Sequence, residues 1–128
     1  MTASQVVLYV LVTIVAFVYV RRWLTLRGMK QYSPLEVADV MKKAGAILLD
    51  VRTAAERQRQ TIKGSLHIPL HELGRRVAEL EKHRDREVIC YCQSGNRSIT
   101  AAAKLRKAGF TVANMKGGIV EWNSSGLR

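Results

Sequence analysis

The distribution of hydrophobic residues divides the chain into a uniformly apolar first segment and a longer part with alternating helix and strand patterns. The first 20 residues contain no Asp, Glu, Lys or Arg, and residues 6–20 are aliphatic or aromatic except for Thr13. Because this run is apolar on every side, it lacks the pattern of an amphipathic surface helix. With its flanks it reaches the roughly 20 residues that cross a hydrocarbon core, which predicts a transmembrane helix over residues 1–24.

A buried core helix and a cleaved signal peptide are the two alternatives for this segment, and both fit less well. The domain that follows is too small to enclose such a helix. A signal peptide carries positive charge before its apolar run and a small-x-small site after it. Here the basic residues follow the run, at Arg21, Arg22, Arg27 and Lys30. The positive-inside rule then predicts a single-pass protein of the plasma (inner) membrane, with its N-terminus outside and its domain in the cytoplasm.

The charge of the chain is a second indication of a membrane. The formal net charge is +11, and residues 25–31 are expected to form a basic juxtamembrane tether beside anionic lipid heads. No helix-turn-helix, zinc-finger or RNA-recognition pattern accompanies the charge, so nucleic acid is not an expected partner. The expected partner is the lipid bilayer, which the chain would contact through residues 1–24.

Helix and strand patterns alternate over residues 32–128. Ser33, Pro34 and Glu36 combine an N-cap, a first-turn proline and a capping box, which predicts a helix that ends near Lys43. Gly45 suits the left-handed position after that helix. Further strands are expected over residues 46–50, 88–91 and 110–114, and further helices over residues 71–83 and 98–108. This alternation predicts an α/β domain with an open, mostly parallel sheet and helices on both faces.

The chemically most informative residue is Cys92, which ends a short β-branched run and precedes a turn into a helix. Gly95 and Asn96 in that turn tolerate positive φ. The N–H groups and the positive dipole end of the following helix favour a thiolate, so we expect Cys92 to lose its proton more easily than a free cysteine. Cys90 shares the same strand face and is expected to be a buried packing residue. Two cysteines at this spacing favour a reducing compartment.

Four residues separate Cys92 from Arg97, and this loop resembles the active-site loop of the rhodanese-like sulfurtransferases. Three further segments resemble signatures of that family in the same order along the chain: residues 49–52 with Glu56, residues 62–70, and the Gly pair and Trp of residues 116–122. Upstream of the second signature the chain departs from the family, which usually has an aromatic residue, a Gly and a His. The residues found there are Arg57, Gln60 and Thr61.

The resemblance covers residues 31–123 and implies a rhodanese-like fold for residues 32–128. It also implies a membrane-anchored sulfurtransferase, with thiosulfate or a persulfide as sulfane sulfur donor and a thiol or cyanide as acceptor. Cys92 is the implied catalytic nucleophile and would carry the sulfur as a persulfide. The residues implied to bind the substrate are Gln93, Ser94, Gly95, Asn96, Arg97 and Ser98. No cofactor is implied, and no Cys/His spacing indicates a metal site.

The sequence leaves two roles open for Arg97, the charged residue of this loop. Arg97 would either bind the anionic donor or brace the loop through a carboxylate, Asp50 or Glu56. Asp50 is also expected to cap its turn, and Arg52 is expected to form a local ion pair with Glu56.

Two further functions compete with sulfur transfer. The domain could be a partner-binding or sulfur-carrier module at the membrane, without thiosulfate turnover. It could also be a phosphatase or arsenate reductase. Members of those classes that use a similar loop have five residues between Cys and Arg, because a tetrahedral oxyanion needs the larger ring. The loop of this chain is one residue shorter.

Overall fold

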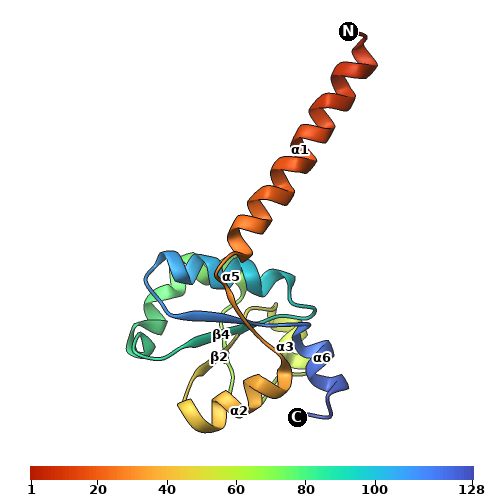
Figure 1. Ribbon diagram of the computed structural model, residues 1–128. Coiled ribbons are helices and arrows are strands. Elements are labelled where there is room, and N and C mark those ends of the chain that lie inside the picture. Colours follow the sequence, from red (N-terminus) through yellow and green to blue (C-terminus); the bar gives the residue numbers. More distant parts are fainter.

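The computed structural model describes residues 1–128, with the side chains of all of them except Ala44. A long helix, α1 (Ala3–Leu26), projects from an α/β domain (Figure 1). The domain is built on a five-stranded sheet of order β1-β5-β4-β2-β3, in which every neighbouring pair is parallel. The strands are β1 (Lys30–Tyr32), β2 (Ile47–Asp50), β3 (Leu66–His67), β4 (Val88–Tyr91) and β5 (Val112–Met115).

Helices cover both faces of this sheet, as the alternating pattern predicts. One face packs against α5 (Asn96–Lys107) and a segment made of η1 (Leu70–Glu72), α4 (Leu73–Arg76) and η2 (Val77–His83). The other face packs against α2 (Pro34–Ala44) and α6 (Gly118–Ser124). The remaining helix, α3 (Ala54–Arg59), follows the carboxyl end of β2. The predicted fold class, a mostly parallel α/β sheet preceded by one long apolar helix, is confirmed.

The central strand β4 is buried on both sides, which explains its continuous apolar sequence. Val88 and Cys90 join the core under α5, whereas Ile89 and Tyr91 join the core under α2 and α6. Successive side chains of a strand point to opposite faces, so Cys92, at the end of β4, shares the α5 side with Cys90. The predicted burial of Cys90 is confirmed, since its exposed fraction is 0%.

The predicted α2 is also confirmed in detail. Ser33 accepts a hydrogen bond from the N–H of Glu36, and the Glu36 side chain accepts one from the N–H of Ser33. Pro34 occupies the first turn, and Gly45 follows the helix at φ 63°. The capping box satisfies backbone N–H groups that the helix start would leave unpaired, and Pro34 has no N–H to satisfy.

The expected regular helix over residues 71–83 is wrong. Only Leu73–Arg76 is α-helical, between 3-10 turns on either side. Gly74 lies inside this segment and costs about 1 kcal/mol relative to Ala in a helix. Three ion pairs join residues three apart, the spacing that is eclipsed in a 3-10 helix; they are Arg75–Glu72, Arg76–Glu79 and Arg84–Glu81. The buried positions are nevertheless those of the hydrophobic pattern, because Leu73 and Leu80 are each 1% exposed.

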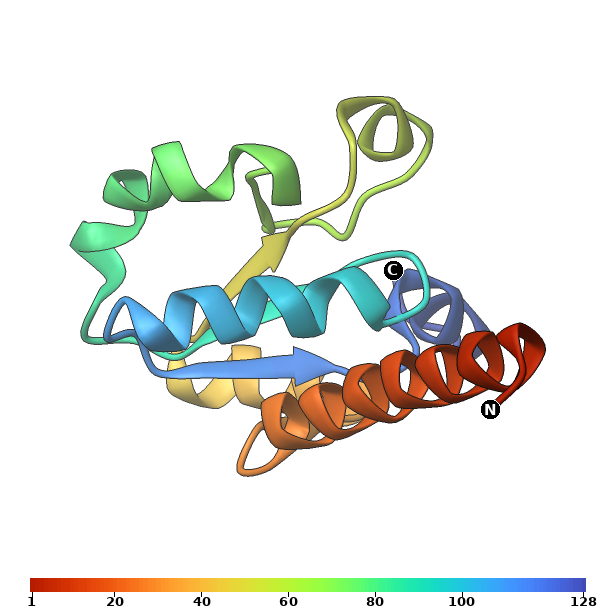
Figure 2. The same cartoon turned by 90° about the horizontal axis from the view of Figure 1, so that it is seen from above.

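Residues 25–31, predicted as a juxtamembrane tether, comprise the last two residues of α1, a turn and the first two residues of β1. The helix is long and apolar enough to cross a membrane, and none of its described residues is buried in the domain. Its end lies beside α5 (Figures 1 and 2), where the Arg106 guanidinium donates to the carbonyl of Thr25 at 3.2 Å.

Candidate active site

The loop between β4 and α5 encloses the sulfur of Cys92. The N–H of Gly95 donates to Cys92 Sγ at 3.1 Å, and Ser98 Oγ lies 3.4 Å from the same sulfur. Gly95 has φ 101°, a left-handed conformation that L side chains rarely adopt, and the N–H groups of Ser94, Gly95 and Ser98 in this loop are hydrogen-bonded to the sulfur. The helix after the loop begins at Asn96, two residues earlier than the sequence pattern predicts. The sulfur therefore lies at the N-terminus of α5.

The surroundings of Cys92 favour its thiolate. Burial of the thiol opposes ionisation, but hydrogen bonds from the Ser98 hydroxyl and from the N–H groups of Ser98, Gly95 and Ser94 outweigh it. The pKa of Cys92 is therefore lowered below its ordinary value. Burial raises the pKa of Cys90 to about 12, so this neighbouring thiol stays protonated. The two cysteines thus differ in chemistry, although they lie two residues apart on one strand face.

The first turn of α6 is hydrogen-bonded to the Cys92 loop. The N–H of Ile119 donates to the carbonyl of Cys92 at 2.9 Å, and the N–H of Val120 donates to the carbonyl of Gln93 at 3.2 Å. The close approach requires glycine at position 118, where a Cβ would lie 2.4 Å from the Cys92 carbonyl oxygen. Gly118 also has φ +60°. The Gly pair of the closing signature is thus part of the support of the active loop.

Arg97 braces the loop in this structure. Its guanidinium donates to both oxygens of Glu56, at 2.7 and 2.8 Å, in a bidentate ion pair between α5 and α3. The hydrogen bonds from Arg97 lower the pKa of Glu56 to about 2, against the opposing effect of burial. Of the two roles that the sequence left open, the geometry corresponds to bracing, with Glu56 as the carboxylate.

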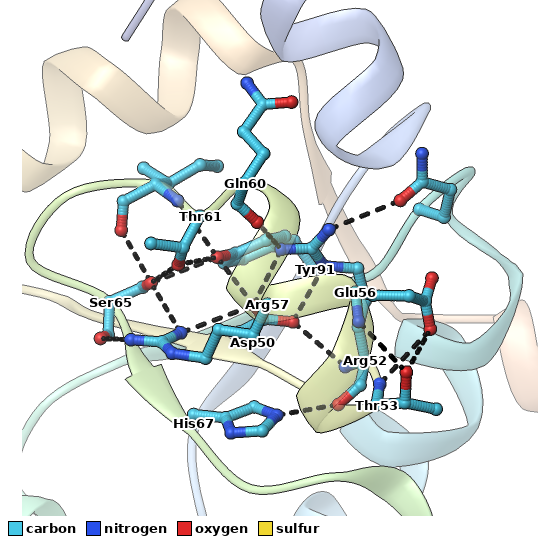
Figure 3. Close-up of polar contacts among 12 residues, drawn as sticks. Asp50, Arg52, Thr53, Glu56, Arg57, Gln60, Thr61, Ser65, His67 and Tyr91 are labelled. Carbon is cyan, nitrogen blue, oxygen red and sulfur yellow. Dashed lines mark hydrogen bonds and ion pairs between the residues drawn. The ribbon is translucent and has the colours of Figure 1, made fainter.

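The expected ion pair between Arg52 and Glu56 is wrong, because Arg52 pairs with Asp50 instead (Figure 3). The two lie two residues apart in extended chain and so share one side of it. Arg52 Nε and Nη2 donate to the Asp50 carboxylate at 3.0 and 2.9 Å. The expected cap is confirmed, since the N–H of Arg52 donates to Asp50 Oδ1 at 2.9 Å. Arg52 Nη1 also reaches Gln93 Oε1 at 3.3 Å, a link to the active loop that the sequence pattern did not reveal.

The residues that depart from the family pattern complete this network (Figure 3). Arg57 Nη1 donates to Asp50 Oδ2 at 3.3 Å and its Nη2 to the carbonyl of Ser65 at 2.8 Å. The hydroxyl of Thr61 lies 3.3 Å from that of Tyr91, which in turn donates to Asp50 at 3.1 Å. Arg57 and Thr61 therefore fix the loop between α3 and β3 to the end of β4.

The remaining predicted site residues lie at the surface of the loop. Gln93, Ser94 and Asn96 are exposed. Asn96 Oδ1 accepts a hydrogen bond at 2.9 Å from Arg22 of α1, 74 residues earlier in the chain, a contact that no sequence pattern indicated. Gln93 lines a hollow of about 160 Å³ with Arg52, Glu56, Arg59 and Gln60. Among the side chains that the structure describes, no three His, Cys, Asp or Glu residues are grouped as metal ligands.

Replacing Ser98 by Ala should make Cys92 a weaker thiolate. The variant loses the hydroxyl hydrogen bond, so the pKa of Cys92 should rise. A hydrogen bond to a charged group contributes about 1.5–3 kcal/mol, so alkylation of Cys92 at neutral pH should slow about tenfold. Alkylation rates followed by mass spectrometry over a pH series would measure this. Ser94→Ala, in the same loop but with an exposed side chain, is the control, and an equal effect of both substitutions would contradict the assignment.

Replacing Glu56 by Gln should remove an acid-sensitive part of the stability. The pKa of Glu56 falls from 4.5 to about 2 on folding, so its contribution is complete above pH 4.5 and disappears as the pH falls through about 2. Because Arg97 is 37% exposed, solvent screening limits the loss at neutral pH to about 1–2 kcal/mol. Urea unfolding from neutral pH to about pH 3 measures it.

Glu36→Gln is the matched control, because Glu36 has the same capping-box contact without an arginine partner. The difference between the two variants should shrink as the pH falls. A difference that stays constant with pH would show that the Arg97–Glu56 pair does not cause it.

Comparison with known proteins agrees with this geometry. Residues 33–125 match the Rhodanese-like domain family. A sulfurtransferase from Allochromatium vinosum is 42% identical over 82 residues, which are 63% of this chain and 75% of that protein. The thiosulfate sulfurtransferase GlpE from Pseudomonas savastanoi pv. phaseolicola is 34% identical over 93 residues, or 72% and 86% of the two chains.

A solved structure shows the same fold. The rhodanese-related protein from Thermoplasma volcanium has a TM-score of 0.71 and 29% identity, and the match covers 77% of this chain and 95% of that one. The family model spans the whole sheet except β1, together with the loop that encloses Cys92, from Ser33 to Ser125. This chain therefore belongs to the rhodanese-like domain family, which includes sulfurtransferases.

Proposed function

We propose that the protein is a membrane-anchored sulfurtransferase that carries a sulfane sulfur on Cys92. The observation that supports this most directly is the position of Cys92 Sγ, which receives hydrogen bonds from the N–H of Gly95 and the hydroxyl of Ser98. These donors favour the thiolate, the reactive form of a cysteine nucleophile. The terminal sulfur of a persulfide is anionic, and hydrogen-bond donors at this position would stabilise its negative charge.

The reaction takes place in two displacements. The Cys92 thiolate attacks the outer sulfur of thiosulfate, the sulfur–sulfur bond of the donor breaks, and sulfite leaves with the bonding electrons. A persulfide donor reacts in the same way and releases a thiolate. Attack by an acceptor thiolate or cyanide on the outer sulfur of the Cys92 persulfide then yields an acceptor persulfide or thiocyanate and restores the Cys92 thiolate.

The charges around the loop suggest where an anionic donor approaches. Arg97 is engaged by Glu56, and Arg52 is engaged by Asp50. Arg59 is exposed and lines the hollow beside Gln93. We therefore assign the attraction of the donor to Arg59 and the stabilisation of the transferred sulfur to the N–H groups of residues 93–98.

The anchoring part of the proposal rests on α1. This helix has 24 residues, is apolar, and leaves its side chains exposed rather than packed on the domain. Burying such a surface in lipid is more favourable than leaving it in water. The basic residues at its end favour a cytoplasmic domain in the plasma (inner) membrane, where a thiol nucleophile stays reduced.

Incubation of the full-length protein with thiosulfate should add one sulfur atom to Cys92, as seen by intact-mass spectrometry. A thiol should remove it. Cys92→Ala should give no adduct, whereas Cys90→Ala, the matched control, should keep it because Cys90 is a buried, protonated thiol. An adduct formed only with a persulfide donor would retain the mechanism and exclude thiosulfate as donor. No adduct with either donor would contradict the sulfurtransferase and favour a binding module.

Charges placed inside α1 should release the protein from membranes. An arginine near the centre of a membrane helix costs about 2.5–3.5 kcal/mol, so Leu11→Arg with Val15→Arg should shift the protein to the soluble fraction on alkaline extraction. Leu35→Arg with Val120→Arg is the control, since both are exposed apolar side chains outside α1. Wild-type protein found in the soluble fraction would contradict anchoring, without bearing on the chemistry of Cys92.

A further inference from the structure

The two segments of the chain that lack carboxylates meet on one side of the domain. Residues 1–35 and residues 88–120 contain no Asp or Glu. The first segment supplies α1, and the second supplies α5. The end of α1 lies beside α5 (Figures 1 and 2), with contacts from Arg22 to Asn96 and from Arg106 to Thr25. The fold therefore collects basic residues from both segments on one face.

We call this surface the α5 face and define it by six exposed basic residues. They are Arg21, Arg22, Arg27, Lys104, Arg106 and Lys107. Among the ion pairs of the described side chains, none involves a member of this set. Their charge is therefore available to an anion from outside the chain.

The neighbouring helical segment shows the opposite arrangement. Arg75, Arg76 and Arg84 are each paired with a glutamate three residues away. This segment covers the same side of the sheet as α5. These three arginines are therefore balanced within their own segment, whereas the basic residues of α5 and of the end of α1 have no carboxylate in the segments that supply them.

The shape between the two helices fits a phospholipid. A hollow of about 300 Å³ separates α1 from α5. Phe17 and Val18 line it on the part of α1 that would be in the membrane, and Arg21 and Arg22 line it toward the domain. Its other wall includes Asn96 of the active-site loop. An apolar part followed by a cationic part is the order that an acyl chain and its phosphate require.

We propose that the α5 face is a docking surface for anionic phospholipid headgroups, which holds the domain flat on the bilayer and places the Asn96 end of the active-site loop in the headgroup layer. Each basic residue near an anionic membrane favours the membrane-bound state about fivefold. This docking rests on the membrane anchoring of the proposed function but not on its chemistry. It predicts that sulfur donors or acceptors at the membrane surface reach Cys92 without leaving that surface.

Fluorescence quenching in the full-length protein tests the docking. A fluorophore on Ala108→Cys reports from beyond the end of α5, in a Cys92→Ser background where the remaining cysteine, Cys90, is buried. The protein is reconstituted in nanodiscs of phosphatidylcholine alone or mixed equally with phosphatidylglycerol. Both contain lipid with a spin label on its headgroup as quencher. Wild-type protein should be quenched several-fold more with phosphatidylglycerol, and added salt should reduce the difference.

Two triple variants separate docking from net charge. Neutralising the α5 residues (Lys104→Gln, Arg106→Gln, Lys107→Gln) should lower the ratio of docked to undocked protein at least about tenfold. The control (Lys42→Gln, Lys63→Gln, Arg128→Gln) removes the same charge from exposed residues that line a hollow on the α2 and α6 side, and should keep the wild-type quenching. Equal quenching of both triples, or quenching independent of phosphatidylglycerol, would overturn the proposal.

The same triple variants with Cys92 intact test the docking proposal separately from the proposed function. Sulfur uptake by mass spectrometry and retention on alkaline extraction should match the wild type in both triples. Absence of sulfur uptake in the wild type would count against the chemistry of the proposed function alone, whereas absence of membrane retention would count against the anchoring and the docking that rests on it. Loss of headgroup quenching in a protein that remains membrane-bound and takes up sulfur would count against docking alone.

Discussion

The active loop depends on one buried carboxylate, that of Asp50. It is 0% exposed and receives hydrogen bonds from Arg52, Arg57 and Tyr91. A buried charge without partners costs several kcal/mol, so these donors must be in place for the fold to form. Because Asp50 and Tyr91 are paired in the sheet, the network joins the ends of β2 and β4 just before the chain reaches Cys92. Arg52 extends it to Gln93, in the loop itself. The hydrogen bonds that neutralise Asp50 thus help to fix the position of the Cys92 sulfur at the end of β4.

Different groups hold the shape of the active loop and stabilise the negative charge of its cysteine. Arg97, the one cationic side chain in the loop, is engaged with Glu56 and links α5 to α3. Anion stabilisation is left to backbone N–H groups and the Ser98 hydroxyl around Cys92. Such donors are fixed by the turn at Gly95 and need no rearrangement when charge appears. This division explains how a cysteine that is only 1% exposed can have a lowered pKa without a cation against its sulfur.

The helix α1 also contacts the active loop. Arg22, close to its end, donates to Asn96, the first residue of α5. The active loop is therefore in contact with α3 through Arg97, with the Gly118 turn through backbone hydrogen bonds, and with α1 through Asn96. A domain held in this way lies close to the end of its apolar helix, and its orientation is set by side-chain contacts rather than by the length of a linker.

Much of this protein is determined by local sequence. The apolar run of α1 and the capping box at Ser33 each act within one element, and the turn from Cys92 to Arg97 joins two consecutive elements, so a short stretch of sequence predicts each of them. The strands β1 and β3 were missed because three and two residues are too few to show a pattern, and they form only by pairing with β5 and β2. The partner of Arg97 was decided by tertiary structure, since Glu56 lies on α3, 41 residues earlier in the chain. The contact of Arg52 with Gln93 also spans 41 residues, although its ion pair with Asp50 is local. The contact of Arg22 with Asn96 likewise joins residues 74 apart, and only the position of the end of α1 beside α5 brings them together.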